Sequence, residues 1–287
     1  MRNILPVLTV VAVIVALWYG AAVWLNSAWV QDQAARAGAS VSLQQLLHDT
    51  MVQERPVLPA PHQVLAGLWD GVAGQALTSK RSLVYHGWIT LSATLAGFAL
   101  GTAAGLLLAV GIVHSRAMDM SVMPWAIASQ TIPILAIAPM VIVVLASLGI
   151  KGLLPKALIA AYLSFFPVLV GMVKGLRAPD GMQLDLLRTY NASRAQTFFR
   201  LRLPSAMPYL FASLKVGIAA ALVGTIVAEL PAGATAGLGA RLLSGSYYGQ
   251  TIQIWAALFA AALLAAVLVA LVGVAERVVL KRMGMAR

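Results

Sequence analysis

The chain has 287 residues, 61% of them hydrophobic and only 10% charged, a composition that excludes a soluble globular domain and indicates a polytopic membrane protein. It contains no cysteine, which excludes disulfides and thiolate metal sites. The formal net charge of +11 would suggest nucleic-acid binding in a soluble protein, but in a membrane protein it bears on topology, because Lys and Arg accumulate on the cytoplasmic side.

Six apolar stretches predict an all-α membrane protein with about six transmembrane helices. They are residues 4–25, 88–113, 121–150, 157–173, 207–230 and 251–275. A cleaved signal peptide is the alternative for the first stretch, but the apolar core of such a peptide is shorter than this one. We therefore expect an uncleaved first span.

The longest polar region, residues 26–81, predicts two amphipathic helices that lie against the bundle. The first is marked by three leucines: Leu43, Leu46 and Leu47. The second is marked by five apolar residues: Val64, Leu65, Leu68, Trp69 and Val72. Prolines between positions 56 and 61 break the chain between them.

Glycines recur every fourth residue in the second span, at Gly97, Gly101 and Gly105. This spacing puts them on one face of a helix, where a neighbouring helix can approach closely. The stripe predicts packing within the bundle, which we favour, or a tight contact with a second copy of the chain.

The third stretch carries prolines at positions 124, 133 and 139, and polar residues just before the second of them: Ser129, Gln130 and Thr131. A proline frees a backbone carbonyl, and irregular backbone at membrane depth is tolerated where protein or a water-filled path satisfies it. Gln130 and Thr131 are therefore predicted to line a solute pathway. The alternative is that they bond to a neighbouring helix and touch no solute.

The later spans contain few interruptions. Residues 165–167, Phe-Phe-Pro, are predicted to interrupt the fourth span, and Lys215 of the fifth is expected to snorkel to the nearby surface. Glu229 ends the fifth span, where it either anchors the helix end or forms a gate salt bridge to Arg241. A Gly-rich loop is expected over residues 233–249.

Residues 185–204, DLLRTYNASRAQTFFRLRLP, form a strongly basic segment between apolar spans, so this segment must lie in water. Asn191 can adopt the left-handed conformation that ends a helix, and Ser193 with Gln196 is a capping box that starts another. Pro204 is expected to break the backbone before the next span. A helix-corner-helix with exposed leucines indicates a surface that presses on another protein.

Charge counting gives the topology. With six spans and a cytoplasmic amino terminus, the cytoplasmic segments hold 13 of the 20 Lys and Arg, counting Lys215. The bias places both termini and residues 185–204 in the cytoplasm.

The basic segment resembles the cytoplasmic loop of permease subunits of bacterial binding-protein-dependent ABC importers, which reads E-A-A, three residues, G, nine residues, I, any residue, L-P. Asp185 stands at the Glu position, Asn191 at the Gly position, and Leu203-Pro204 closes the pattern, with every spacing kept. Leu186 and Leu187 replace the two alanines. The resemblance implies a type I ABC importer permease fold.

Further motifs resemble the nitrate, sulfonate and taurine branch of these permeases. They are LPAP at 58–61, the P-x-x-A-x-x-P pattern of Pro133, Ala136 and Pro139, FFP at 165–167 and VAEL around Glu229. By this resemblance the coupling residues are Asp185, Leu186, Leu187, Arg188, Tyr190, Asn191, Ala192, Ser193, Leu203 and Pro204. The pathway residues predicted from the proline-rich stretch and the fifth span are Ser129, Gln130, Thr131, Pro133, Pro139 and Glu229.

The resemblance also implies partners. Such permeases form homodimers in the bacterial inner membrane, with two copies of a cytoplasmic ABC ATPase and a periplasmic substrate-binding protein. The chain has no G-x-x-x-x-G-K-[ST] motif, so ATP and its Mg ion are expected on the ATPase and not here. We expect residues 1–82 to form an amino-terminal helix with a periplasmic amphipathic segment, and 83–287 to form a five-helix core with a coupling loop at 176–206.

The function predicted is transport without catalysis by this chain. The alternative is a secondary transporter or channel without an ATPase, although acidic residues are almost absent from the spans. The candidate pathway offers neutral amides and hydroxyls and no ring of Arg or Lys. This favours a small polar cargo, such as a pyrimidine or a vitamin precursor, over nitrate or a sulfonate.

Overall fold

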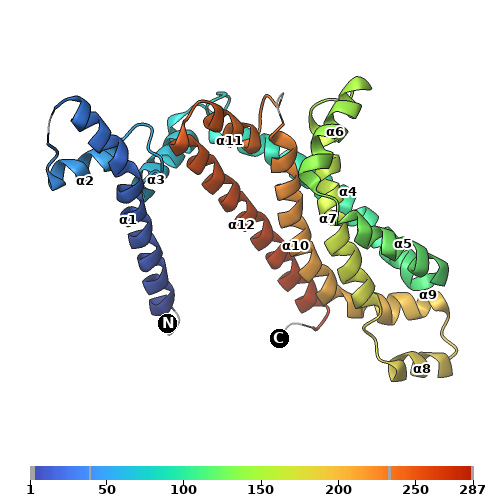
Figure 1. Cartoon of the computed structure of the whole chain (residues 1–287). Helices are drawn as coiled ribbons and strands as arrows, with labels where there is room; N and C mark the ends of the chain where they lie inside the picture. The colour runs from blue at the N-terminus through green and yellow to red at the C-terminus, as the bar shows by residue number, and fades with distance from the viewer. Residues whose placement is uncertain (1–3, 39, 232–233, 286–287) are drawn as a thin grey trace. The chain divides into compact units, whose positions relative to one another are not determined.

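The computed structural model describes residues 4–38, 40–231 and 234–285, and every regular element in these ranges is helical. Figure 1 labels the α-helices among the elements of the chain. They are α1 (Ile4–Arg36), α2 (Leu43–Val52), α3 (Pro61–Trp69), the π-helical turn η1 (Asp70–Gly74), α4 (Leu83–His114), α5 (Arg116–Ser129), α6 (Ile134–Ser147), α7 (Leu153–Leu176), α8 (Gly181–Thr189), α9 (Arg194–Thr197), the π-helical turn η2 (Phe198–Arg202), α10 (Leu203–Glu229), α11 (Leu238–Tyr247) and α12 (Thr251–Arg282). Residues 1–3, 39, 232–233 and 286–287, which fall within the predicted ranges 1–82, 83–287 and 233–249, lie outside the described residues.

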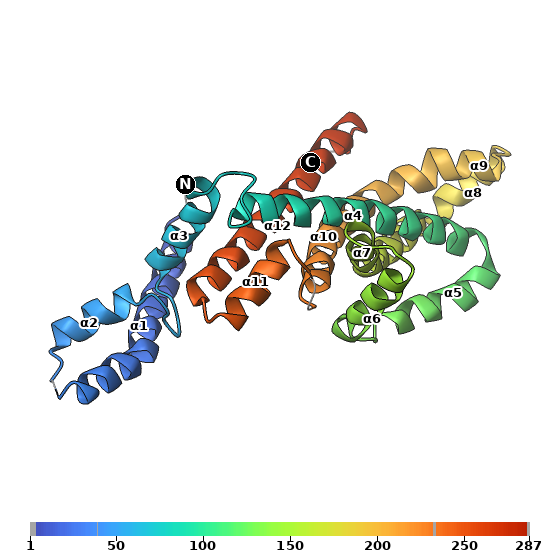
Figure 2. The same cartoon turned by 90° about the horizontal axis from the view of Figure 1, so that it is seen from above.

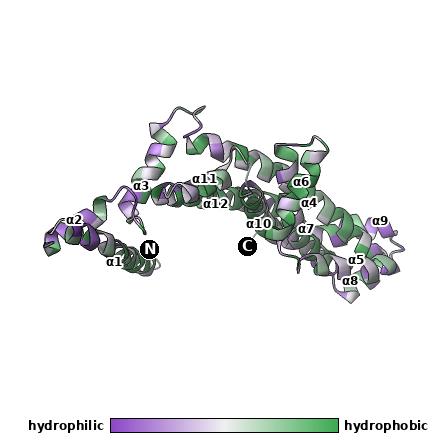
Figure 3. Ribbon diagram, turned by 45° about the horizontal axis from the view of Figure 1, so that its top comes forward, coloured by the Kyte–Doolittle hydropathy of each residue, from purple (hydrophilic) through white to green (hydrophobic). Residues whose placement is uncertain are grey.

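Within the described ranges, five helices are long and apolar enough to cross a membrane, or six if the bent pair α5 and α6 counts as one span. This agrees with the predicted all-α fold of about six spans. Figure 3 shows the contrast in hydropathy between these spans, which are largely green, and the polar helices α2 and α9, which are purple.

The chain divides into two compact units. The first is Met1–His86 with Ala240–Ala261, and the second is Gly87–Gly239 with Ala262–Arg287.

In the first unit, a buried asparagine on α1 organises the segment between α2 and α3. The Asn26 side chain donates to the Leu58 carbonyl at 2.9 Å and accepts from the backbone N–H groups of Val57 at 2.8 Å and Leu58 at 3.2 Å. Each of these polar groups is thereby satisfied without water. The break expected from the prolines is present, and its backbone is held to α1 by these bonds.

Aromatic residues hold the start of α12 in the same unit. The Trp18 ring lies 5.1 Å from that of Trp255 and 5.8 Å from that of Phe259, and its Nε1 donates to the Pro59 carbonyl at 3.0 Å. The Thr251 hydroxyl donates to the Pro56 carbonyl at 2.5 Å. The segment around residues 56–59 therefore links α1 to the beginning of α12.

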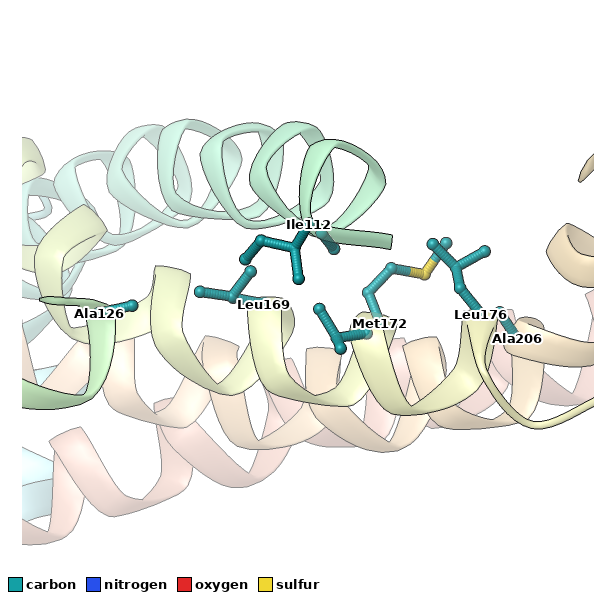
Figure 4. Packing of buried hydrophobic residues seen from close by; sticks show 8 residues of the cluster. Ile112, Ala126, Leu169, Met172, Leu176 and Ala206 are labelled. Carbon is teal, nitrogen blue, oxygen red and sulfur yellow. The ribbon is translucent and has the colours of Figure 1, made fainter. Parts of the chain in front are cut away.

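The second unit is built on α7, which packs against both α4 and α10; Figures 1 and 2 show α7 beside α10. The glycine stripe of α4 faces α7: a Cβ added at Gly101 would lie 2.8 Å from the Ala161 carbonyl oxygen, and one at Gly105 would lie 2.8 Å from that of Phe165. Packing within the bundle is therefore the role of the stripe here. Figure 4 shows the adjoining core, with Leu169 and Met172 of α7 facing Ile112 of α4.

The third predicted span is not one straight helix. Residues 116–129 form α5 and residues 134–147 form α6, and the two are bent by 96°. The cause is Pro133, which has no N–H to continue the helix and becomes the N-cap of α6. Figures 1 and 2 show this turn.

Two predicted interruptions are absent. Pro167 lies inside α7, which continues from residue 153 to 176 because its long contact with α10 outweighs one lost hydrogen bond. Pro204 does not break the chain before the fifth span either, since residues 194–229 run as one helical segment. The π-helical turn η2 widens the helix there, and the Leu203 N–H bonds to the Phe198 carbonyl instead of the usual residue four back.

One other expectation needs correction. Residues 238–247 of the expected Gly-rich loop form helix α11, because a glycine costs a helix only about 1 kcal/mol relative to alanine. Lys215, for which the sequence predicted a place near the surface, forms an ion pair with the Glu276 carboxylate on α12.

Candidate functional site

The predicted coupling segment folds as two short helices, α8 and α9, joined by a corner (Figure 1). Helix α8 begins earlier than Asp185: the Asp180 N–H donates to the Gln183 side chain at 3.2 Å, which supports a start at residue 181. Helix α9 begins with the predicted capping box. The Gln196 N–H donates to the Ser193 Oγ at 3.2 Å, and the Ser193 N–H donates to the Gln196 Oε1 at 2.8 Å.

Asn191 ends α8 in the left-handed conformation that the sequence predicted, with φ of +53°. The Asn191 N–H donates to the Arg188 carbonyl and the Ala192 N–H donates to the Leu187 carbonyl, both at 2.9 Å. This pair of bonds is the Schellman motif, in which a residue of positive φ lets the last carbonyls of a helix find donors. The corner is therefore fixed by its own backbone.

An apolar ridge lies on one side of α8. Met182, Leu186 and Tyr190 are spaced four residues apart, which places them on one helix face, and their exposed fractions are 79%, 57% and 77%. No residue of α8 is buried. We call these three residues the α8 ridge; exposed apolar side chains gathered on one face indicate an interaction surface.

The predicted coupling residues therefore fall into two groups. Six are exposed: Asp185, Leu186, Arg188, Tyr190, Asn191 and Ser193. Four are half-buried: Leu187 and Ala192 at the corner, and Leu203 and Pro204 in the first turn of α10. Asp185 and Arg188, which do not belong to the ridge, also form an exposed ion pair of 2.9 Å on α8.

The predicted pathway residues Ser129, Gln130 and Thr131 lie at the bend between α5 and α6. Pro133 frees the Ser129 carbonyl, which accepts a hydrogen bond from the Tyr162 hydroxyl of α7. The Thr131 hydroxyl donates to the Ala128 carbonyl at 2.8 Å, and the Gln130 amide donates to the Ser129 Oγ at 3.2 Å. Their polar groups thus have partners within the chain, while Thr131 and Pro133 are exposed.

Pro139, the remaining proline of the pathway set, lies inside α6 and is exposed. Glu229, in contrast, is fully buried at the end of α10 and pairs with Lys156 of α7 at 3.0 Å. Its other oxygen accepts from the Thr90 hydroxyl at 2.8 Å and from the Gly239 N–H at 3.0 Å.

Lys156 also donates to the Ala236 carbonyl at 2.8 Å. The Glu229 carboxylate therefore ties α4, α7 and the segment before α11 to the end of α10, as an anchor of the helix end. The cation that pairs with Glu229 is Lys156, whereas the sequence suggested Arg241 as one of two alternatives. The structure brings Ser129, Gln130 and Thr131 together at one bend, and it gives Glu229 a separate, buried environment.

Comparison with known proteins identifies the family. A family described as the binding-protein-dependent transport system inner membrane component matches residues 101–285. The riboflavin transport system permease RibX of Chloroflexus aurantiacus is 33% identical over 78% of this chain and 80% of its own length. This chain belongs to that permease family.

Other relatives are named for different cargoes. The formylaminopyrimidine transport permease ThiX of Halalkalibacterium halodurans is 29% identical over 66% of this chain and 71% of its own length. The putative aliphatic sulfonates transport permease SsuC of Bacillus subtilis is 24% identical over 84% of this chain and 83% of its own length. The protein is accordingly the permease subunit of an ABC importer, and it spans a membrane through several apolar helices.

Sequence reasoning missed parts of this permease's candidate sites. Met182 was not assigned to the coupling set because the motif begins three residues later, although its spacing of four from Leu186 is visible in the sequence. Lys156 lies just before the fourth predicted span, residues 157–173, so its pairing with Glu229 does not follow from the sequence. A cation at the edge of a span, with a lone acid at the edge of another, was the available signal.

Proposed function

We propose that this permease is driven by a cytoplasmic ABC ATPase that docks on the α8 ridge. The observation that carries the proposal is the exposure of Met182, Leu186 and Tyr190 along one face of a helix that buries nothing in its own chain. Helix-in-groove recognition uses apolar anchors at this spacing. Closure of the ATPase around ATP would then move α8, and the helices attached to it would carry the motion.

The exposed residues Asp185 and Arg188 suit the rim of such an interface, because charged rim contacts set orientation more than affinity. Leu187 and Ala192 pack at the corner and hold α8 in place. Leu203, in the first turn of α10 beside Pro204, packs against the buried core cluster that includes Ile112 and Met172. In this arrangement the partner holds ATP and Mg, and the permease carries out no catalysis of its own.

The docking experiment replaces two ridge residues together, Leu186→Asp and Tyr190→Asp, in the complete transporter. Buried apolar anchors each contribute about 2 kcal/mol or more to an interface, so co-purified ATPase should fall by more than about tenfold. Leu77→Asp is the matched control, because Leu77 is exposed to 67% in the turn before α4. Full retention of the ATPase by the double variant, or transport without an ATPase, would overturn the proposal.

The same proposal places the protein in the inner membrane with both termini in the cytoplasm. The excess of Lys and Arg in the segments assigned to the cytoplasm supports this orientation. Because the chain has no cysteine, a single Leu186→Cys or Leu77→Cys variant, expressed without the ATPase that would cover the ridge, can be labelled in intact cells with a membrane-impermeant maleimide. Leu77→Cys should react and Leu186→Cys should react only after permeabilisation; the reverse pattern would refute the topology.

Two copies of the permease are proposed to enclose the pathway, with a periplasmic binding protein on the outer side. The bend between α5 and α6 supports a dimer, because Thr131, Pro133 and Pro139 are exposed in the single chain and so available to face a second copy. Cross-linking of a Thr131→Cys variant should give a dimer. Leu100→Cys on α4, where the side chain is also exposed, serves as the comparison.

The cargo proposed is a small nitrogen heterocycle. Relatives at 33% and 29% identity are named for riboflavin and formylaminopyrimidine transport, whereas those named for sulfonates and nitrate are 24% identical. The neutral amide and hydroxyls at the α5 and α6 bend suit an uncharged polar solute. Calorimetric titration of the cognate binding protein with riboflavin, formylaminopyrimidine, an aliphatic sulfonate and nitrate tests this, and preferential binding of either anion would refute it.

A further inference from the structure

A large polar cavity lies within the first unit of the chain. Its volume is about 720 Å³, within the range of about 300–1,000 Å³ that is common for small-molecule sites. The walls come from the segment after α2, from α3 and η1, from the turn before α4, from α11 and from the start of α12. The cavity takes no part in the coupling surface or in the predicted pathway set.

Three arginines line this cavity: Arg55, Arg81 and Arg241. Two carboxylates, Glu54 and Asp70, also line it, so the charged lining is net positive. Among the described residues, no ion pair joins any of the three arginines to a carboxylate. The Asp70 carboxylate instead accepts a hydrogen bond from the Gln75 amide at 3.4 Å.

Arg241 has a buried hydrogen-bond donor without an acceptor among the residues described. Its Nε is buried and has no hydrogen-bond partner within the part of the chain that the structure describes. Burial, and then the like charge of Arg81, lower the pKa of the Arg241 guanidinium from its usual value. The group nevertheless stays protonated at neutral pH, so two guanidinium groups that repel each other line the same cavity.

The backbone around Arg241 is held in place from neighbouring residues. The Ser244 hydroxyl donates to the Arg241 carbonyl at 3.1 Å, and the Gln253 amide donates to the same carbonyl at 3.4 Å. These contacts fix the chain from which the guanidinium extends into the cavity wall. A positioned arginine is suited to oxyanions, because its planar fork of N–H donors matches two oxygens of a carboxylate or phosphate.

We propose that this cavity binds one oxyanion, a phosphate or carboxylate group, between Arg241 and Arg81, with Arg55 at its edge. The anion would give the buried Nε an acceptor and would separate the two like charges. The same group can come from a free solute or from the headgroup of a phospholipid. The proposal is independent of the α8 ridge and of the identity of the cargo.

The first test titrates the purified full-length permease in nonionic detergent with inorganic phosphate at constant ionic strength, following its Tm by tryptophan fluorescence. We expect a saturable rise in Tm. Each charge-assisted hydrogen bond lost should weaken binding by about tenfold, so Arg241→Gln and Arg81→Gln should each raise the Kd for phosphate by about that factor. Arg81 is exposed, which keeps the test informative if Arg241→Gln fails to fold.

Lys80→Gln is the matched control, because it removes one positive charge beside Arg81 from an exposed side chain outside the cavity. Its Kd should stay within about twofold of the wild type. A second arm measures retention of phosphatidylglycerol by native mass spectrometry. Retention by the wild type and by Lys80→Gln, with loss in Arg241→Gln and Arg81→Gln, would identify a lipid headgroup as the source.

Two outcomes would overturn the proposal. One is the absence of both a saturable phosphate effect and specific lipid retention in the wild type. The other is an equal change in Lys80→Gln and in the two arginine variants, because binding would then follow the net charge of the surface and not the cavity. Loss of the ATPase from the ridge variant affects neither arm, so failure here and failure of the coupling proposal are distinguishable.

Discussion

Helices α7 and α8 follow each other in the chain but are stabilised in opposite ways. Of the 24 residues of α7, 11 are buried, and the helix packs against α4 and α10. None of the nine residues of α8 is buried. A nine-residue helix is marginal by itself in water, so α8 depends on its own caps and on whatever covers its ridge. Burial thus separates the helix that maintains the fold from the helix that offers a surface.

The largest expected loss of stability follows from removing the Glu229 carboxylate, which pairs with Lys156 in the first turn of α7. Glu229→Ala leaves Lys156 partly buried without its counter-ion and deprives Thr90 and Gly239 of an acceptor. Loss of one partner of a buried ion pair costs about 3–5 kcal/mol. The Tm of the purified permease should fall strongly.

The control for this change is the double variant Lys156→Met with Glu229→Gln, which removes both charges and keeps an oxygen for Thr90 and Gly239. It should recover most of the lost Tm, because neutral replacement of a buried pair is often close to neutral in stability. If the double variant is as unstable as Glu229→Ala, the two residues do not act as a pair. If it folds and fails to transport, the pair has a role in gating beyond anchoring α10.

A second change tests the close contact of α4 with α7. In Gly101→Leu the new side chain would press against the Ala161 carbonyl and the Phe165 amide, which are backbone atoms and cannot move aside. Overpacking of this kind costs up to about 3 kcal/mol, seen as a lower Tm and less monodisperse protein on size exclusion. Gly87→Leu on the same helix is the control, because a Cβ there meets nothing within 4 Å. Equal loss in both would show that the close contact with α7 is not the cause, because leucine favours a helix more than glycine does and would not by itself lower the Tm.

The difference between locally stabilised and packed elements also determines which features the sequence predicted. Local rules predicted the features that depend on a few neighbouring residues: the positive φ of Asn191, the capping box at Ser193 and the apolar spans. They failed at Pro167 and Pro204, where packing on α10 and a π-helical turn absorb the proline. The cost of a proline can be predicted from its own position, whereas packing on a neighbouring helix or a change in backbone geometry that compensates for it cannot.

The candidate sites follow the same pattern. The bend at Pro133 lies next to the residues predicted for the pathway, because a freed carbonyl and its polar neighbours are adjacent in sequence. The Lys156 and Glu229 pair joins residues 73 positions apart, and the arginine cavity joins residues from positions 54 to 256. No periodicity or motif connects such distant residues. Their proximity becomes visible only once the helices are packed.

A residue of the α8 ridge should contribute to ATPase binding and not to the stability of the permease. Tyr190→Ala removes a side chain exposed to 77% and should weaken ATPase binding by about 2 kcal/mol, with an unchanged Tm of the isolated permease. Surface plasmon resonance with the purified ATPase measures the first quantity. Thr189→Ala, the adjacent exposed position off the ridge, should change binding by less than about 0.5 kcal/mol.

The smallest expected effect concerns the corner that holds the ridge in place. Asn191 has a φ of +53°, a conformation that glycine adopts freely and alanine adopts at a cost of about 1 kcal/mol. Asn191→Gly should therefore preserve ATPase binding, and Asn191→Ala should weaken it slightly by loosening the Schellman bonds of Ala192 to Leu187 and of residue 191 to Arg188. Hydrogen exchange at the amides of residues 190–192 provides the direct measurement, with faster exchange expected in the alanine variant alone. Equal exchange in the two variants would mean that the corner is held by side-chain packing, in which case Leu187→Ala should open it instead.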